Sequence, residues 1–178
     1  MNVALVIGHK EHRPGACNVS NGICEFYFNK KLAKDISNKL SIDNQIVYRE
    51  DAGSYSKLPF YINKYIYPNF VISLHCNAFN TKASGTEVLY YHTSIKGKAM
   101  AEEIQKNLLE ALKLPDRGIK GRGTEDRGGS LLRYTNAPCV ISESFFIDNN
   151  SDLARVKDKY EEMVSAYVKS INNIKNFI

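Results

Sequence analysis

The sequence predicts a single α/β domain over residues 1–178, with a mixed, mostly parallel sheet of about six strands flanked by helices on both faces. Short apolar stretches rich in Val, Ile and Tyr alternate with longer stretches of helical periodicity. The strand-like stretches are continuously apolar, as in strands buried on both faces of a sheet. The length of 178 residues suits one hydrophobic core.

Six short stretches are expected to form the strands. They are enriched in residues that favour strands and are bounded by polar or glycine-containing segments. The first apolar run, Val3–Ile7, is ended by Gly8 and the polar residues that follow. The six expected strands are Asn2–Ile7, Gln45–Arg49, Asn69–His75, Thr86–His92, Leu131–Tyr134 and Pro138–Glu143.

Three longer stretches repeat apolar residues every three to four positions and are expected to be helices. A shorter helix is expected from Pro59 to Ile66, with a cap near Ser56. The segment from Pro115 to Ser130 is polar, contains five glycines and is expected to be a long surface loop. The three apolar stripes are Phe28 to Leu40, Met100 to Leu112 (ended by Pro115), and Leu153 to Ile171 (capped by Asn150 or Ser151).

Composition excludes several classes of protein. Hydrophobic residues make up 43% and charged residues 24%, which argues against disorder, and the net charge of +5 is spread along the chain without a basic tail. We therefore expect no nucleic-acid partner.

No span approaches the roughly 20 apolar residues of a membrane helix. No signal peptide is recognised, so synthesis in the cytoplasm is expected. The four cysteines show no C-x-x-C spacing and are expected to be reduced, mostly packed thiols.

Three residues with catalytic or metal-binding side chains stand at the ends of expected strands. His9 follows the first strand, His75 ends the third, and Glu143 ends the last. Ligands of open α/β sheets bind at the carboxyl ends of the strands. A single histidine after a strand is usually a cap or a solvated residue, but three such residues at one edge indicate a site.

Glu25 lies on the apolar stripe of the first helix, three residues before Phe28 and seven before Leu32. This position points its carboxylate towards the sheet, where an ionised group needs a partner or a metal. Two other interpretations remain open: a partly solvated residue in the first helical turn, or an ion pair with a lysine such as Lys10.

Together, His9, Glu25 and His75 match a catalytic zinc site, which has three protein ligands and leaves one coordination position to water. A further carboxylate is then needed to move protons, and Glu143 is available for this role. The spacing contains no compact zinc motif. His12 could replace His9 as a ligand, although a solvated position at the rim is the simpler interpretation.

The residues around these positions resemble the type 3 family of zinc-dependent N-acetylmuramoyl-L-alanine amidases, especially the catalytic domains of phage endolysins. The resemblance covers nearly the whole chain and departs from the family pattern at Lys10, Cys76 and Phe145. It is carried by Val6-Ile7-Gly8-His9, Glu25-Phe26-Tyr27-Phe28-Asn29, Ser73-Leu74-His75-Cys76-Asn77-Ala78, Gly85-Thr86-Glu87-Val88, Arg117-Gly118-Ile119-Lys120, Leu132-Arg133, and the stretch from Ala137-Pro138 to Glu143 and Asn149.

The resemblance implies a Zn²⁺-dependent hydrolase that cuts the amide between N-acetylmuramic acid and L-alanine in peptidoglycan, and that acts on the cell wall after release. His9, Glu25 and His75 would hold one Zn²⁺, and Glu143 would be the general base and then the acid. Asn77 and Arg133 are candidates for substrate contact or for orienting a ligand. Two alternatives are a zinc peptidase that cuts within the stem peptide and a wall-binding module that has lost catalysis.

Overall fold

Six strands form one sheet in the order β2-β1-β3-β6-β4-β5 in the computed structural model, which describes residues 1–178. Neighbouring strands are parallel except β4 and β6, so the mixed, mostly parallel α/β fold is confirmed. The strands are β1 (Asn2–Ile7), β2 (Asp43–Val47), β3 (Phe70–Asn77), β4 (Thr86–Tyr91), β5 (Asp116–Arg122) and β6 (Cys139–Phe146).

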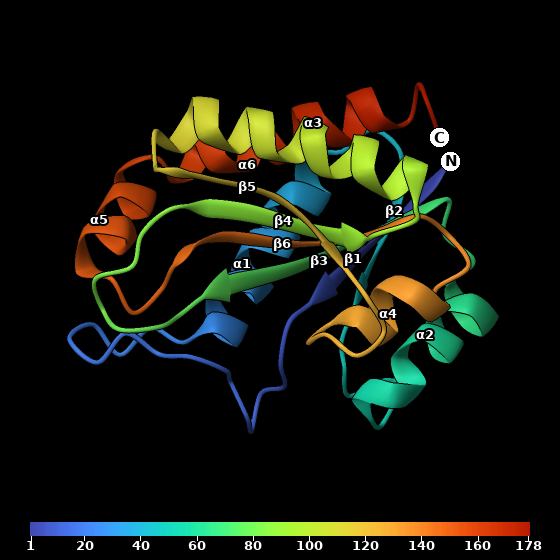
Figure 1. The fold of residues 1–178 in the computed structure, drawn as a ribbon, viewed down its shortest axis with the longest axis horizontal. Coiled ribbons are helices and arrows are strands. Elements are labelled where there is room, and N and C mark those ends of the chain that lie inside the picture. Colours follow the sequence, from blue (N-terminus) through green and yellow to red (C-terminus); the bar gives the residue numbers. More distant parts are fainter.

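Helices cover both faces of this sheet, as Figure 1 shows. The helices α1, α3 and α6 cover one face of the sheet, and α2 and α4 lie together on the other face. No helix is both long enough and apolar enough to span a bilayer. The helical elements are α1 (Glu25–Lys39), η1 (Tyr55–Lys57), α2 (Leu58–Tyr61), η2 (Ile62–Ile66), α3 (Ile95–Leu112), α4 (Gly129–Tyr134), α5 (Asn150–Asp158) and α6 (Tyr160–Ile174).

The two faces of the sheet bury two separate cores because successive side chains of a strand point to opposite sides. In β1, Val3 and Leu5 join the larger core beneath α1, α3 and α6, whereas Ala4 and Val6 join the smaller core beneath α2 and α4. The helices over the smaller core are short. They leave the carboxyl-terminal half of the central strands uncovered on that face, where the cleft described below lies.

The expected loop from Pro115 to Ser130 and the expected strand Leu131–Tyr134 are both wrong. Residues 116–122 form β5, an edge strand that pairs only with β4. The exposed edge position of β5 explains its polar, glycine-containing sequence. A search of the sequence for apolar runs does not detect such a strand. Residues 129–134 form α4, which buries Leu131 and Leu132 against α2. Four residues are too few for their periodicity to separate a strand from a helix.

The third expected helix is two helices. The backbone leaves the helical conformation at Lys159 (φ −106°, ψ 27°), which separates α5 from α6. Asn149, one residue before the expected cap, begins α5, and its side-chain oxygen accepts the backbone N–H groups of Ser151 and Asp152. The short helix expected from Pro59 to Ile66 is confirmed by α2 and the π-helical η2.

The expectation of reduced cysteines is wrong for one pair. Cys17 and Cys24 form a disulfide within the loop between β1 and α1, while Cys76 and Cys139 are buried thiols. A turn at residues 18–22 brings the pair together: the backbone N–H groups of Asn21 and Gly22 bond to the carbonyl of Asn18. This pairing depends on the loop's conformation, and the spacing of seven residues carries no recognised signature.

Candidate active site

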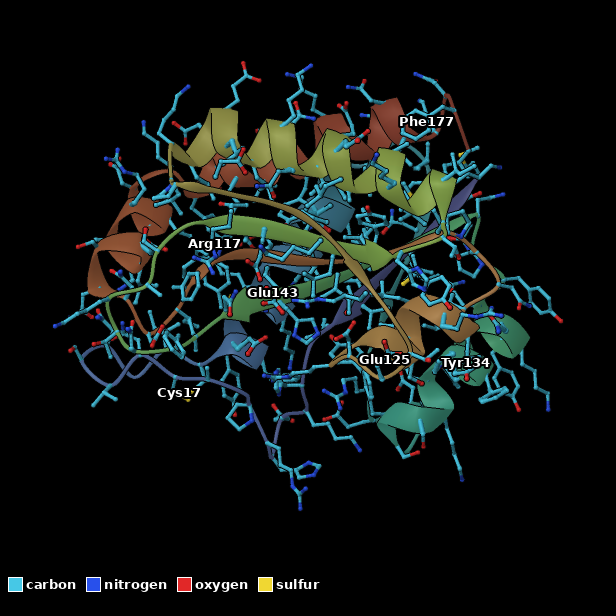
Figure 2. All side chains as sticks on the ribbon, viewed as in Figure 1. Cys17, Arg117, Glu125, Tyr134, Glu143 and Phe177 are labelled. Atoms are coloured by element: carbon cyan, nitrogen blue, oxygen red, sulfur yellow. A yellow bond between two sulfur atoms is a disulfide. The ribbon has the colours of Figure 1, made fainter.

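The strand ends place His75, Glu143 and Glu87 in one row on the face of the smaller core. His75 on β3 stands in register with Glu143 on β6, and Glu143 stands in register with Glu87 on β4. Because β4 is antiparallel to β6, its beginning lies at the edge where β3 and β6 end. Figure 2 shows Glu143 near the middle of the molecule, with Arg117 of β5 above it.

His9 lies directly beyond β1 at the same edge, next to the row. Its backbone has a φ of +66°, a conformation rare outside glycine. The preceding Gly8 donates its N–H to the carbonyl of Leu74 on β3 and leaves space that the His75 ring needs. A Cβ at Gly8 would lie 2.7 Å from His75 Nδ1. The two imidazole rings are thereby 5.4 Å apart between centroids.

Glu25 is the first residue of α1 and is 2% exposed. Its carboxylate reaches the two histidines: Oε1 lies 2.8 Å from His75 Nδ1, and Oε2 lies 3.1 Å from His9 Nε2. Oε1 also accepts the backbone N–H of Cys76. The structure excludes both open interpretations of Glu25, since the residue is buried and Lys10 instead donates to the carbonyl of Gly53.

The loop before α1 holds this helix start in place without a capping side chain. The carbonyl of Ala16 accepts the N–H of Glu25, and the carbonyl of Pro14 accepts that of Phe26. These bonds satisfy two N–H groups that a helix start leaves free. The buried side chain of Asn18 anchors the loop to the segment after β6 by donating a hydrogen bond to the carbonyl of Ile147.

The three side chains fit a divalent metal ion. One ligand atom from each of His9, Glu25 and His75 lies within 4.8 Å of the others. His9 Nε2 is buried and makes no hydrogen bond despite its short distance to Glu25, so its lone pair has no partner in the protein. Two imidazole nitrogens and one carboxylate are a recurring ligand set of catalytic zinc.

The pKa values of Glu25 and His75 depend on each other. Burial acts to raise the pKa of Glu25, but the hydrogen bond from His75 and the close approach of His9 outweigh it, and the pKa lies well below its usual value. Burial acts to lower the pKa of His75, but the bond to Glu25 and the charges of Glu143 and Glu25 raise it. Glu25 therefore remains a carboxylate, the form that binds a metal.

Glu143 has a different environment from Glu25. Its Oε2 is buried and makes no hydrogen bond. Burial is the largest cause that raises the pKa of Glu143 to about 7; the negative charges of Glu25 and Glu87 act in the same direction, against His75 and Arg127. A carboxyl group with a pKa near neutrality is suited to both accepting and releasing a proton.

The structure places Asn77 in the cleft and Arg133 outside it. The Asn77 amide donates to Glu87 Oε1 at 3.1 Å, so it orients a second buried carboxylate. Arg133 is exposed on α4, where its guanidinium stacks on Tyr91 and Tyr134. His12 is exposed at the rim, away from the histidine–glutamate cluster.

Sequence reasoning missed four residues of the site. Glu87 forms an ion pair with Arg117 at 2.9 Å, and a charged residue inside an apolar strand was the signal for it. The other three residues are Arg49, Tyr55 and Arg127, which line the cleft from loops and η1. Their local sequence contains no comparable signal. The cleft has a volume of about 920 Å³, the size of a site for an extended ligand.

The sequence profile of the N-acetylmuramoyl-L-alanine amidase family matches residues 3–173. The chain belongs to this family. Among solved structures, the amidase of Clostridium difficile 630 has the same fold, with a TM-score of 0.83 and 23% identity; the similarity covers 99% of this chain and 97% of that one. The amidase fold thus includes nearly every residue described above.

Curated relatives of this amidase family member are longer. The amidase LytC of Bacillus subtilis is 28% identical over 156 residues, which cover 84% of this chain and 30% of LytC. The endolysin of Bacillus phage SPP1 is 33% identical over 88 residues, which cover 48% of this chain and 32% of the endolysin. The matched segments therefore cover less than a third of the length of either relative.

Proposed function

We propose that this chain hydrolyses the amide bond between N-acetylmuramic acid and L-alanine in peptidoglycan, with Zn²⁺ held by His9, Glu25 and His75. Family membership supports the reaction. One observation carries the proposal: His9 Nε2, the Glu25 carboxylate and His75 Nδ1 converge beside Glu143, whose buried Oε2 has no partner in the protein.

Zn²⁺ bound by these ligands supplies Lewis acidity, which makes water more acidic and polarises a carbonyl group. Glu143 accepts a proton from the attacking water at its carboxylate and later donates it to the nitrogen of alanine as the C–N bond breaks. The products are a muramoyl carboxylate and a peptide with a free N-terminal L-alanine. Asn77 and Arg117 fix the charge of Glu87 next to Glu143.

The protein is made in the cytoplasm. After its release, this activity lyses the cell wall. The similarity to a phage endolysin supports a role in lysis. The site residues lie on the carboxyl edge of the sheet at an open cleft, which gives a polymer access to them.

Digestion of purified peptidoglycan tests the reaction. A new N-terminal L-alanine is expected; any other new terminus would support a peptidase, and binding without solubilisation would support a non-catalytic module. Glu143→Gln should lose about 10²- to 10⁴-fold in rate while retaining zinc. Glu125→Gln is the matched control because Glu125 is an exposed residue outside the cleft lining (Figure 2).

Metal removal tests the cofactor independently of turnover. Chelation should abolish wall solubilisation and lower Tm, and added Zn²⁺ should restore both, because a ligand that binds only the folded state stabilises it. At a free Zn²⁺ concentration 100 times the Kd, this stabilisation is about 2.7 kcal/mol. A metal-free protein that solubilises walls at the original rate would refute the zinc assignment.

A further inference from the structure

The cleft contains more positive charge than its own acids neutralise. Its acidic residues are Glu87, Asp126 and Glu143. Glu87 is already paired with Arg117, and Asp126 accepts the backbone N–H of Gly123. Five lysine and arginine residues line the same cleft: Lys10, Arg13, Arg49, Arg122 and Arg127. None of the four arginines forms an ion pair within the protein.

Arg49 is partly buried and lines the same cleft as His9 and His75. Its guanidinium stacks on the Tyr55 ring at 4.5 Å, and its Nε is buried without a hydrogen-bond partner. Buried cations in proteins are normally paired with an anion or an acceptor. Because the protein supplies neither, the arrangement indicates a partner in the ligand.

Arg127 supplies a second positive charge to the same cleft. It lies between β5 and α4 in a turn that is fixed by the bond from the Gly123 N–H to Asp126. Burial is the largest cause that lowers the pKa of the Arg49 guanidinium; Tyr55, Glu50 and Glu25 oppose this shift, and Arg127 adds to it. Arg49 and Arg127 line the same cleft, so their like charges repel each other there. An anion placed between them relieves this repulsion.

We propose that Arg49 and Arg127 form a carboxylate-binding subsite for the stem peptide, next to the bond that is cut. This inference rests on the proposed function. The residue after L-alanine in stem peptides is a glutamate with a free α-carboxylate or the corresponding carboxamide. It lies about one extended residue, roughly 3.5 Å, beyond the scissile amide. A guanidinium binds a carboxylate through paired charge-assisted hydrogen bonds, which a neutral carboxamide cannot replace.

The subsite predicts a preference for peptidoglycan with the free carboxylate at this position. Hydrogen bonds that involve two charged groups are stronger than those with a neutral partner, which corresponds to a preference of about 10- to 100-fold in kcat/KM. The preference should depend on Arg127, which is exposed and whose replacement leaves the packing of the protein intact.

The test compares kcat/KM for two synthetic muramoyl peptides that differ only in carboxylate or carboxamide at the second stem residue. The wild-type protein should prefer the carboxylate, and Arg127→Gln should reduce the ratio to within about threefold of one. Arg155→Gln is the matched control, because Arg155 is exposed on α5 away from the cleft, and it should keep the wild-type ratio. Arg49→Gln should also reduce the ratio, with a Tm measurement to report any loss of the Tyr55 contact.

A wild-type ratio near one, or an unchanged ratio in Arg127→Gln, would overturn the subsite while leaving the amidase reaction in place. A cleft that instead binds the phosphate of an anionic wall polymer gives this result, because both peptides would be cut equally. Hydrolysis of neither peptide by the zinc-loaded wild type would overturn the proposed function, and the subsite with it.

Discussion

Gly15 lies behind the metal ligands, and replacing it with alanine should weaken metal binding specifically. Its backbone has a φ of +80°. A Cβ there would lie 2.6 Å from Glu25 Oε2 and 2.7 Å from Cδ2 of His9. No pair of unbonded atoms tolerates such distances, so one or both ligands must move. Gly22 in the same loop has a similar φ of +65° and no atom within 4 Å of the equivalent Cβ.

The two variants separate backbone strain from displacement of the ligands. An alanine in the left-handed region costs about 1–2 kcal/mol, and both Gly15→Ala and Gly22→Ala carry this cost. Only Gly15→Ala pushes on Glu25 and His9. Metal sites tolerate shifts of about 0.2 Å in ligand distance, and disturbance of groups that support the ligands typically weakens binding about 10- to 100-fold.

Competition with a chromophoric chelator measures zinc affinity, and urea unfolding of the metal-free proteins measures stability. We expect both variants to lose stability through the shared backbone cost, with a further loss in Gly15→Ala, and Gly15→Ala alone to lose zinc affinity by about 10- to 100-fold. Equal zinc affinity in Gly15→Ala and Gly22→Ala would refute the reasoning, because it would show that the carboxylate and imidazole positions do not determine metal binding.

Two further predictions concern the loop and the general base. Replacing Cys17 and Cys24 by serine should lower the free energy of unfolding by about 2 kcal/mol, measured in urea, because the disulfide restricts the unfolded chain; an unchanged midpoint would contradict this. In metal-free protein, the raised pKa of Glu143 favours its protonated form when folded, so its contribution to stability is full below pH 4.5 and is lost as the pH rises to about 7. The free energy of unfolding of Glu143→Gln relative to wild type should therefore rise by up to about 3 kcal/mol across this window, and a constant difference would contradict the assignment.

The central part of the fold was predictable because its strands are apolar on both faces. β1, β3 and β6 lie in the interior of the sheet order, and each contains a short apolar run with Val and Ile, which is typical of a strand buried on both faces. The edge was not predictable in the same way. β5 pairs on one side only, exposes much of its surface and therefore carries the polar residues that a loop would carry.

The positions that hold chemistry followed from the same logic. His9, His75 and Glu143 follow the apolar runs of β1, β3 and β6, and Glu25 begins the helix whose apolar stripe faces the sheet. Each is therefore a polar residue where burial is expected. Arg127 lies in a turn whose conformation depends on hydrogen bonds between neighbouring residues, and nothing in its local sequence relates it to Arg49. Such a pair of residues can be identified only from the three-dimensional structure.

The uneven covering of the sheet connects this fold to its chemistry. On the face of the larger core, α1, α3 and α6 cover the strands, and the side chains beneath them are apolar. On the other face, α2, η2 and α4 cover only the part of the strands around Val6, Val71 and Ile141. Beyond this part, the same alternation that points Val71 inward points His75 into the cleft. Longer helices on this face would bury these polar groups, so the short elements are what keep the ligands, the general base and the arginines accessible to a polymer.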